Sequence, residues 1–288
     1  MTPLILGARP QQPLKVNVDL VNVLFTITDR TGHLVTGLKR EDFAVEEDGR
    51  KQEITSFSRE AELPLTIGML IDTSASVRRV FPAEKETAIH FLETVMKSGD
   101  LAFVIGFERI VTLVEDFSED QRRLRAAIDS LTIGQGTSIN DAVYLACKDL
   151  LDKEGGRKAI ILISDGQDTT SKIRLSEALV AAYHSDAVIY SISNRIGGFF
   201  HVQGSGDPET LRQYSVESGG TVFFVGGRSD LTRVFEQIAE ELRAQYSLGY
   251  TSSNTARDGK FRKIRVVTKD PTYQVKARTG YYAPLSAP

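Results

Sequence analysis

The chain has 288 residues, of which 41% are apolar, 25% charged and 8% aromatic, values that exclude a disordered, collagen-like or coiled-coil protein. Its formal net charge is −3, and no stretch reaches the roughly 18 consecutive apolar residues that predict a membrane-spanning helix. The single cysteine, Cys147, excludes an intrachain disulfide framework and a cysteine-based zinc or redox site.

The two ends of the chain have little pattern. The start, MTPLILGARPQQP, has too short an apolar run for a signal peptide, so the residues alone indicate no location. A leader removed from a longer form would carry that information. We expect residues 1–13 and 285–288 to be flexible tails.

Residues 14–60 have the texture of β-structure. Apolar and polar residues alternate in VNVLFTITD and FAVEED, and turn-forming residues lie between the runs at positions 29–32 and 48–49. The aromatic and β-branched residues of EITSF end this stretch. The pattern therefore predicts strands and hairpins without a competing helix.

Residues 61–244 alternate short apolar runs with amphipathic stretches, which predicts a mostly parallel sheet flanked by helices. We expect six strands, at 65–72, 101–107, 110–114, 159–164, 187–193 and 221–226. Apolar residues recur at helical intervals between them, in 80–97, 119–131, 140–153, 174–186, 207–218 and 229–244. The predicted class is α/β, a doubly wound sheet of six strands.

Strand texture returns in residues 245–284, where QYSLGYT and KFRKIRVVTK are predicted to form a hairpin around SSNTARDG, followed by a strand in YQVKARTGYYA. Neither end of the chain has enough strands for a core of its own. We therefore expect residues 14–60 and 245–284 to form one β-sandwich, with 61–244 inserted as the α/β domain. A separate β domain at each end is the less favoured arrangement.

Charge is distributed unevenly along these segments. Residues 1–60 have a net charge of −1, residues 61–244 of −8 and residues 245–288 of +6. A basic tail can contact nucleic acid or an anionic surface. We favour a structural interpretation, in which charges on the solvated face of an edge strand prevent further pairing. The cations concerned are Lys260, Arg262, Lys263, Arg265 and Lys269.

Oxygen-bearing side chains follow two of the predicted strands. Asp72 ends LTIGMLID and is followed by Ser74 and Ser76, while Asp165 follows IILIS and Thr137 lies in GQGTSIND before a helix. Residues 72–76 alone also fit a strand end followed by a helix cap. In an open parallel sheet, however, ligands bind outside the carboxyl ends of the strands. If the two strands are adjacent, these oxygens converge in a set that suits a hard divalent cation.

These three segments resemble the von Willebrand factor A domain, whose metal-ion-dependent adhesion site has the pattern Asp-x-Ser-x-Ser, then Thr, then Asp. The resemblance covers roughly residues 63–243 and is carried by DTSAS, the Thr of GQGT and the Asp of SDG. It implies a bound Mg²⁺, or Ca²⁺ or Mn²⁺. The implied ligands are Ser74, Ser76 and Thr137, with Asp72 and Asp165 acting directly or through water.

The same resemblance implies a function in binding. Two carboxylates balance the charge of the cation and neutral hydroxyls add none, so the cation can accept one more anionic oxygen. A partner protein's Asp or Glu would supply that oxygen, which predicts a protein-binding module and no enzyme. The flanks VTGLKREDFAVEEDGRKQEITSF and QYSLGYTSSNTARDGKFRKIRV are similar to bacterial, mainly acidobacterial, von Willebrand-factor-A-related proteins, which implies an extracytoplasmic location.

Other residues near these segments have supporting or open roles. We expect Asp141 to support the site or the start of its helix rather than to bind the cation directly, and Asp168 to cap the following segment or orient its loop. The Gly-rich loop 195–207 contains Phe199, Phe200 and His201. Phe pairs usually pack in a core, but on a loop beside a metal site these residues could contact a partner.

Two other functional classes are kept as alternatives. One is an accessory subunit of an ATPase-driven assembly or a chelatase-type complex, where similar domains occur. The other is a hydrolase using the cation as a Lewis acid, which would need a general base beyond the acids already assigned as ligands. The four histidines lie in unrelated segments, and nothing in the sequence indicates nucleic-acid binding, a nucleophilic triad or a particular oligomeric state.

Overall fold

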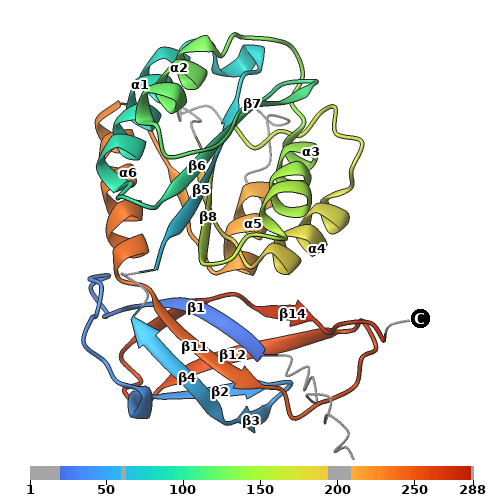
Figure 1. Ribbon diagram of the computed structural model, residues 1–288. Coiled ribbons are helices and arrows are strands. Elements are labelled where there is room, and N and C mark those ends of the chain that lie inside the picture. Colours follow the sequence, from blue (N-terminus) through green and yellow to red (C-terminus); the bar gives the residue numbers. More distant parts are fainter. Residues whose placement is uncertain (1–19, 60–62, 194–208, 227, 287–288) are drawn as a thin grey trace, which may run out of the picture.

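The computed structural model describes residues 20–59, 63–193, 209–226 and 228–286, which form an α/β part and a β-sandwich below it (Figure 1). The α/β part has a six-stranded sheet in the order β10-β9-β8-β5-β6-β7, parallel except for β7. Its strands are β5 (Leu65–Asp72), β6 (Leu101–Phe107), β7 (Val111–Ser118), β8 (Arg157–Ser164), β9 (Val188–Ser193) and β10 (Val222–Phe224).

Helices cover both faces of this sheet. One face packs against α1 (Phe81–Val95), α2 (Gln121–Ser130) and α6 (Arg228–Arg243). The other face packs against α3 (Ile139–Tyr144), the π-helical turn Leu145–Leu151 that continues it, α4 (Leu175–Ser185) and α5 (Glu209–Ser218). Every residue of β5 and β8 is buried, which explains their continuous apolar runs.

The β-sandwich combines strands from the two ends of the described chain. One sheet has the order β13-β1-β11-β4 and the other β14-β12-β2-β3, with all pairs antiparallel. The strands are β1 (Leu20–Thr28), β2 (Phe43–Glu47), β3 (Arg50–Gln52), β4 (Ile54–Arg59), β11 (Tyr246–Thr251), β12 (Phe261–Thr268), β13 (Gln274–Ala277) and β14 (Gly280–Tyr282). The predicted fold class is therefore confirmed, while the exact domain boundaries stay a prediction.

Two details of the predicted β-structure were wrong. The segments QYSLGYT and KFRKIRVVTK form no hairpin, because β11 and β12 belong to different sheets. The chain between them passes from one sheet to the other, held by Ser252, whose hydroxyl donates to Glu47 at 2.6 Å. The predicted last strand is also broken in two, because Thr279 turns toward α5 and its amide donates to the Glu217 carbonyl at 3.2 Å.

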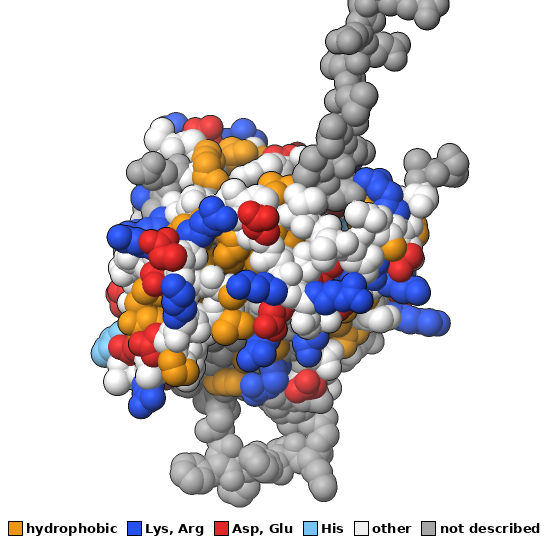
Figure 2. Space-filling model, turned by 90° about the horizontal axis from the view of Figure 1, so that it is seen from below, with side chains coloured by type: hydrophobic (Ala, Val, Ile, Leu, Met, Phe, Trp, Pro, Cys, Tyr) orange, Lys and Arg blue, Asp and Glu red, His pale blue; other side chains and the backbone are white. Residues whose placement is uncertain are grey.

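The charged residues of β12 do not protect an edge, so that interpretation was wrong too. β12 lies between β14 and β2. Lys263 and Arg265 point outward, but Arg262 is buried and pairs with Asp258 at 2.8 Å. Figure 2 shows cations mixed with Asp and Glu over this underside of the molecule. The +6 charge of the C-terminal segment is thus spread over a mixed surface.

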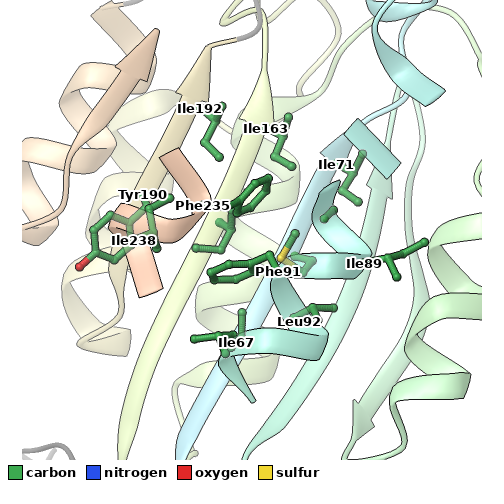
Figure 3. Packing of buried hydrophobic residues seen from close by; sticks show 14 of the residues in the cluster. Ile67, Ile71, Ile89, Phe91, Leu92, Ile163, Tyr190, Ile192, Phe235 and Ile238 are labelled. Carbon is green, nitrogen blue, oxygen red and sulfur yellow. The ribbon is translucent and has the colours of Figure 1, made fainter. Parts of the chain in front are cut away.

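The core of the α/β part aligns the sheet with its helices (Figure 3). Phe91 of α1 and Phe235 of α6 lie with ring centroids 4.8 Å apart above β5 and β8. Alternate residues of the strands, including Ile67, Ile71 and Ile163, face this layer and are fully buried. Below this layer, β5 and β8 pair in parallel, so their carboxyl ends lie beside each other.

Candidate metal centre

Asp72 is the last residue of β5 and is completely buried. One of its carboxylate oxygens, Oδ1, accepts a hydrogen bond from the Ser74 amide at 2.8 Å, which turns the chain sharply after the strand. The hydroxyl oxygens of Ser74 and Ser76 lie 2.8 Å apart, Ser74 being buried and Ser76 exposed. A carboxylate and two hydroxyls therefore occupy one compact turn at the end of the strand.

The neighbouring strand supplies a contact that we did not predict. β5 and β8 pair in parallel with Ile71 opposite Ile163, so Ser164 lies beside Asp72. The Ser164 hydroxyl donates to Asp72 Oδ2 at 2.6 Å, and both side chains are fully buried. The available signal in the sequence was a serine at the end of the apolar run 159–163 of β8, directly before Asp165.

Asp165 follows β8 and is half-buried, and its Oδ1 accepts from the Gln167 amide at 3.1 Å. Its charge interacts with Asp72 strongly enough to contribute to raising the pKa of that residue. The strands that precede Asp72 and Asp165 are thus adjacent, and their pairing brings these two acidic residues together.

The pKa of Asp72 is raised to about 6, mainly because burial destabilises its charged form. Hydrogen bonds from Ser164 and Ser74 oppose this rise, and the negative charge of Asp165 adds to it. Within the described residues, no Lys, Arg or His side chain lies within 4.0 Å of either carboxylate. The site is therefore an uncompensated negative centre surrounded by hydroxyls.

Thr137 lies in the loop between α2 and α3, two residues before α3 begins, and is buried. Its carbonyl accepts from the amides of Thr169 and Thr170 at 2.9 and 3.1 Å, and its amide donates to the Thr169 hydroxyl at 3.0 Å. These bonds tie Thr137 to the loop that carries Asp165. The loops bearing Thr137 and Asp165 are consequently one structural unit.

Asp141 and Asp168 strengthen the same unit by binding backbone amides. Asp168 Oδ2 accepts from the Asn140 amide at the start of α3 at 2.9 Å and from the Ser171 hydroxyl at 2.6 Å. Asp141 Oδ1 accepts from the amides of Lys172 and Ile173 at 2.9 and 2.8 Å. Each carboxylate thus connects α3 with the loop after β8.

The remaining predicted residues, Phe199, Phe200 and His201, lie outside the described residues. In the part of the chain that the structure describes, no three His, Cys, Asp or Glu side chains cluster as a metal site. A cation at Asp72 and Asp165 would therefore need hydroxyl oxygens as its further protein ligands, and Ser74, Ser76 and Thr137 are of that type. The donor set fits a hard cation such as Mg²⁺.

The fold and this arrangement define a class: an open α/β sheet with an acidic, hydroxyl-rich site at its carboxyl edge. Residues 67–167 match the family model of the von Willebrand factor type A domain. No curated protein matches the chain. No helix in the described residues combines the length and hydropathy needed to cross a membrane.

Solved structures with a similar fold agree with that match. The von Willebrand factor type A protein from Catenulispora acidiphila has a TM-score of 0.53 at 14% identity, covering 94% of this chain and 75% of that one. Proximal thread matrix protein 1 from the mussel byssus has a TM-score of 0.54 at 17% identity, covering 74% and 51%. The same mussel protein with a zinc-occupied adhesion-site motif has a TM-score of 0.54 at 18% identity, covering 67% and 48%.

This chain spans about half the length of the mussel protein. At these identities the similarity shows the fold. Together with the family model, it supports a von Willebrand factor type A domain in this chain.

Proposed function

We propose that this chain is a divalent-cation-dependent protein-binding module whose metal site engages an acidic residue of a partner. The observation that carries the proposal is the buried Asp72 carboxylate, which lies near Asp165 and has no cationic partner among the described residues. Ser74, Ser76 and Thr137 would be ligands through their hydroxyls, and Asp72 and Asp165 would act directly or through water. The cation would be Mg²⁺, or Ca²⁺ or Mn²⁺.

The chain's own residues hold this site in a fixed shape. Ser164 and the Ser74 amide orient the Asp72 carboxylate, and Asp141 and Asp168 join the loops that carry Thr137 and Asp165. When bound, the cation would carry positive charge and have one coordination position open for a further anionic oxygen. An Asp or Glu carboxylate of a partner has the charge and geometry for that position.

The placement of the site supports binding to a large partner. It lies at the carboxyl ends of β5 and β8, whereas the sandwich packs below the opposite ends of these strands (Figure 1). The sandwich therefore does not cover this edge of the α/β part. The mussel protein with a zinc-occupied adhesion-site motif supports divalent-cation binding on a similar fold. A binding function without catalysis and an extracytoplasmic location are parts of the same proposal.

The direct test is to titrate the full chain with Mg²⁺ and to measure its melting temperature at each concentration. A ligand present at 100 times its Kd stabilises a fold by about 2.7 kcal/mol, so the wild-type protein should melt several degrees higher in excess Mg²⁺. Asp72→Asn keeps the shape of the side chain but removes its charge, and should abolish the increase. Asp129→Asn, an exposed change on α2, is the control and should retain it.

The same melting temperature for wild type with and without Mg²⁺, Ca²⁺ or Mn²⁺ would contradict the metal site. If the cation binds, partner recognition is tested by pull-down from extracellular extracts with and without EDTA. Captured proteins should be released by EDTA and absent with Asp72→Asn. Co-purification with an ATPase independently of the cation would instead support the accessory-subunit alternative.

A further inference from the structure

A second polar site lies where the α/β part meets the sandwich, at the end of the sheet opposite Asp72. A cavity of about 210 Å³ is bounded by the starts of β8 and β9, the end of α4, β1 and the corner between β13 and β14. One water needs only about 10–15 Å³ of such space, so the cavity has room for a small molecule. Its polar lining includes Asn22, Lys158, Tyr183, Asp186, Ser218 and Arg278.

Lys158, the second residue of β8, is buried with 8% of its surface exposed. Its ammonium donates to the backbone carbonyls of Leu151 and Glu154 at 3.3 and 2.9 Å. An ammonium has three donors, so one remains after these two contacts. Within the described residues no carboxylate lies within the 4.0 Å of an ion pair to Lys158.

Arg278 approaches the same cavity from the sandwich. It lies at the corner between β13 and β14, where its guanidinium pairs with Asp186 and donates to the Asn22 carbonyl. Its side chain is only 10% exposed, and its Nε finds no acceptor among the described residues. Nε has no surface open to the cavity, but the two terminal nitrogens of the guanidinium carry four N–H groups, of which these two contacts use two.

The acidic groups around the cavity do not use these remaining donors. Asp186 is paired with Arg278, and Asp152, Glu154 and Asp186 act on Lys158 only at longer range. Burial outweighs their attraction and lowers the pKa of Lys158, because it destabilises the charged ammonium. The buried Lys158 and the largely buried Arg278, one from each part of the molecule, therefore retain donors beside one cavity.

We propose that this cavity is a binding site for a small oxyanion, a carboxylate or phosphate group of a small molecule, held by Lys158 and Arg278. Charge-assisted hydrogen bonds from an ammonium and a guanidinium are the ordinary means of binding such groups. Because Lys158 belongs to the α/β part and Arg278 to the sandwich, a bound anion stabilises the junction. The site is independent of the metal-dependent function proposed above.

The test uses the full chain freed of metal with a chelating resin, so the metal site plays no part and no dissolved carboxylate competes for the cavity. Inorganic phosphate and acetate are titrated separately against chloride at constant ionic strength, and the melting temperature is measured. One of them should raise the melting temperature saturably, and the effective anion identifies the chemical group. Lys158→Met should weaken this binding roughly tenfold or more. Lys263→Met, which changes an exposed lysine of β12 outside the cavity, should leave it unchanged.

Methyl NMR of the wild-type protein locates the anion, so this measurement does not depend on whether a variant folds. The signals of Ala182, Ala187 and Val188, which line the cavity, should shift during the same titration. The proposal is overturned if neither anion raises the melting temperature, if Lys158→Met responds like the wild type, or if only methyl groups away from the cavity shift.

Discussion

The two ends of the central sheet differ in how they bring polar groups together. At the carboxyl ends, Asp72, Ser164 and Asp165 come from neighbouring strands and meet because β5 and β8 pair in register. At the other end, Lys158 and Arg278 come from different parts of the molecule and meet only because the sandwich packs below the sheet. Strand pairing thus assembles the first site, whereas docking of the two parts assembles the second.

The largest expected effect concerns the junction itself. Gly219 has φ +84°, and a Cβ there would lie 2.6 Å from the amide nitrogen of Arg278 and 2.7 Å from the carbonyl carbon of Ala277. Because backbone cannot move aside cheaply, Gly219→Ala should lower the free energy of unfolding by about 4 kcal/mol, measured by urea denaturation.

Gly99→Ala is the matched control for this change. Gly99 has a similar φ of +88°, but no atom lies within 4 Å of the added Cβ. The free energy of unfolding of Gly99→Ala should therefore fall only by the cost of a positive φ in alanine, about 1–2 kcal/mol. Equal losses in the two variants would contradict the close approach of the two parts at Gly219.

The next effect concerns the buried acid at the metal site. The pKa of Asp72 is about 6 in the folded protein and its ordinary value is 3.8. The folded protein therefore binds a proton at Asp72 more tightly than the unfolded chain does. In EDTA, the free energy of unfolding should fall by about 3 kcal/mol in all as the pH rises from below 3.8 to well above 6. Asp72→Asn removes this titration and should flatten that part of the profile, measured by urea denaturation across the pH range.

An identical pH profile for wild type and Asp72→Asn would show that Asp72 is not buried as described. At neutral pH without metal, the Asn variant should also be the more stable of the two, because it buries no charge. This result, together with its lost Mg²⁺ response, would separate the metal-binding role of Asp72 from a structural one.

A smaller effect is expected at Ser164. Replacing it by Ala removes the 2.6 Å hydrogen bond to the buried Asp72 carboxylate, at a cost of about 2 kcal/mol at neutral pH. The pKa of Asp72 should rise further, and Mg²⁺ affinity measured by calorimetry should fall. Ser130→Ala, which removes a hydroxyl donating to the Ala127 carbonyl on α2, should leave Mg²⁺ affinity unchanged.

The smallest change is expected at Asp168. Asp168→Asn weakens the contacts to the Asn140 amide and the Ser171 hydroxyl, and should lower stability by about 1 kcal/mol. Because Asp168 positions the loops without being a proposed ligand, Mg²⁺ affinity should fall roughly 10–100-fold but remain measurable. Complete loss of Mg²⁺ binding, as expected for Asp72→Asn, would instead make Asp168 a ligand.

The candidate ligands could be located from the sequence, but the residues that orient them could not. Asp72, Thr137 and Asp165 were recognisable because each stands where an apolar run ends or a helix begins. Ser164 was not recognised, because its role depends on which residue of the neighbouring strand lies opposite. The contact of Asp168 with the amide of Asn140 was missed for the same reason, since it joins two separate loops.

The sequence by itself determined where most strands and helices lie, because the periodicity of apolar residues is a local property of each segment. Only the tertiary structure decided that β11 and β12 join different sheets, that the last predicted strand breaks near Thr279, and that Arg262 is buried. Only the tertiary structure, likewise, brought Lys158 and Arg278 to one cavity. These outcomes depend on contacts between distant segments, whose energies no local pattern records.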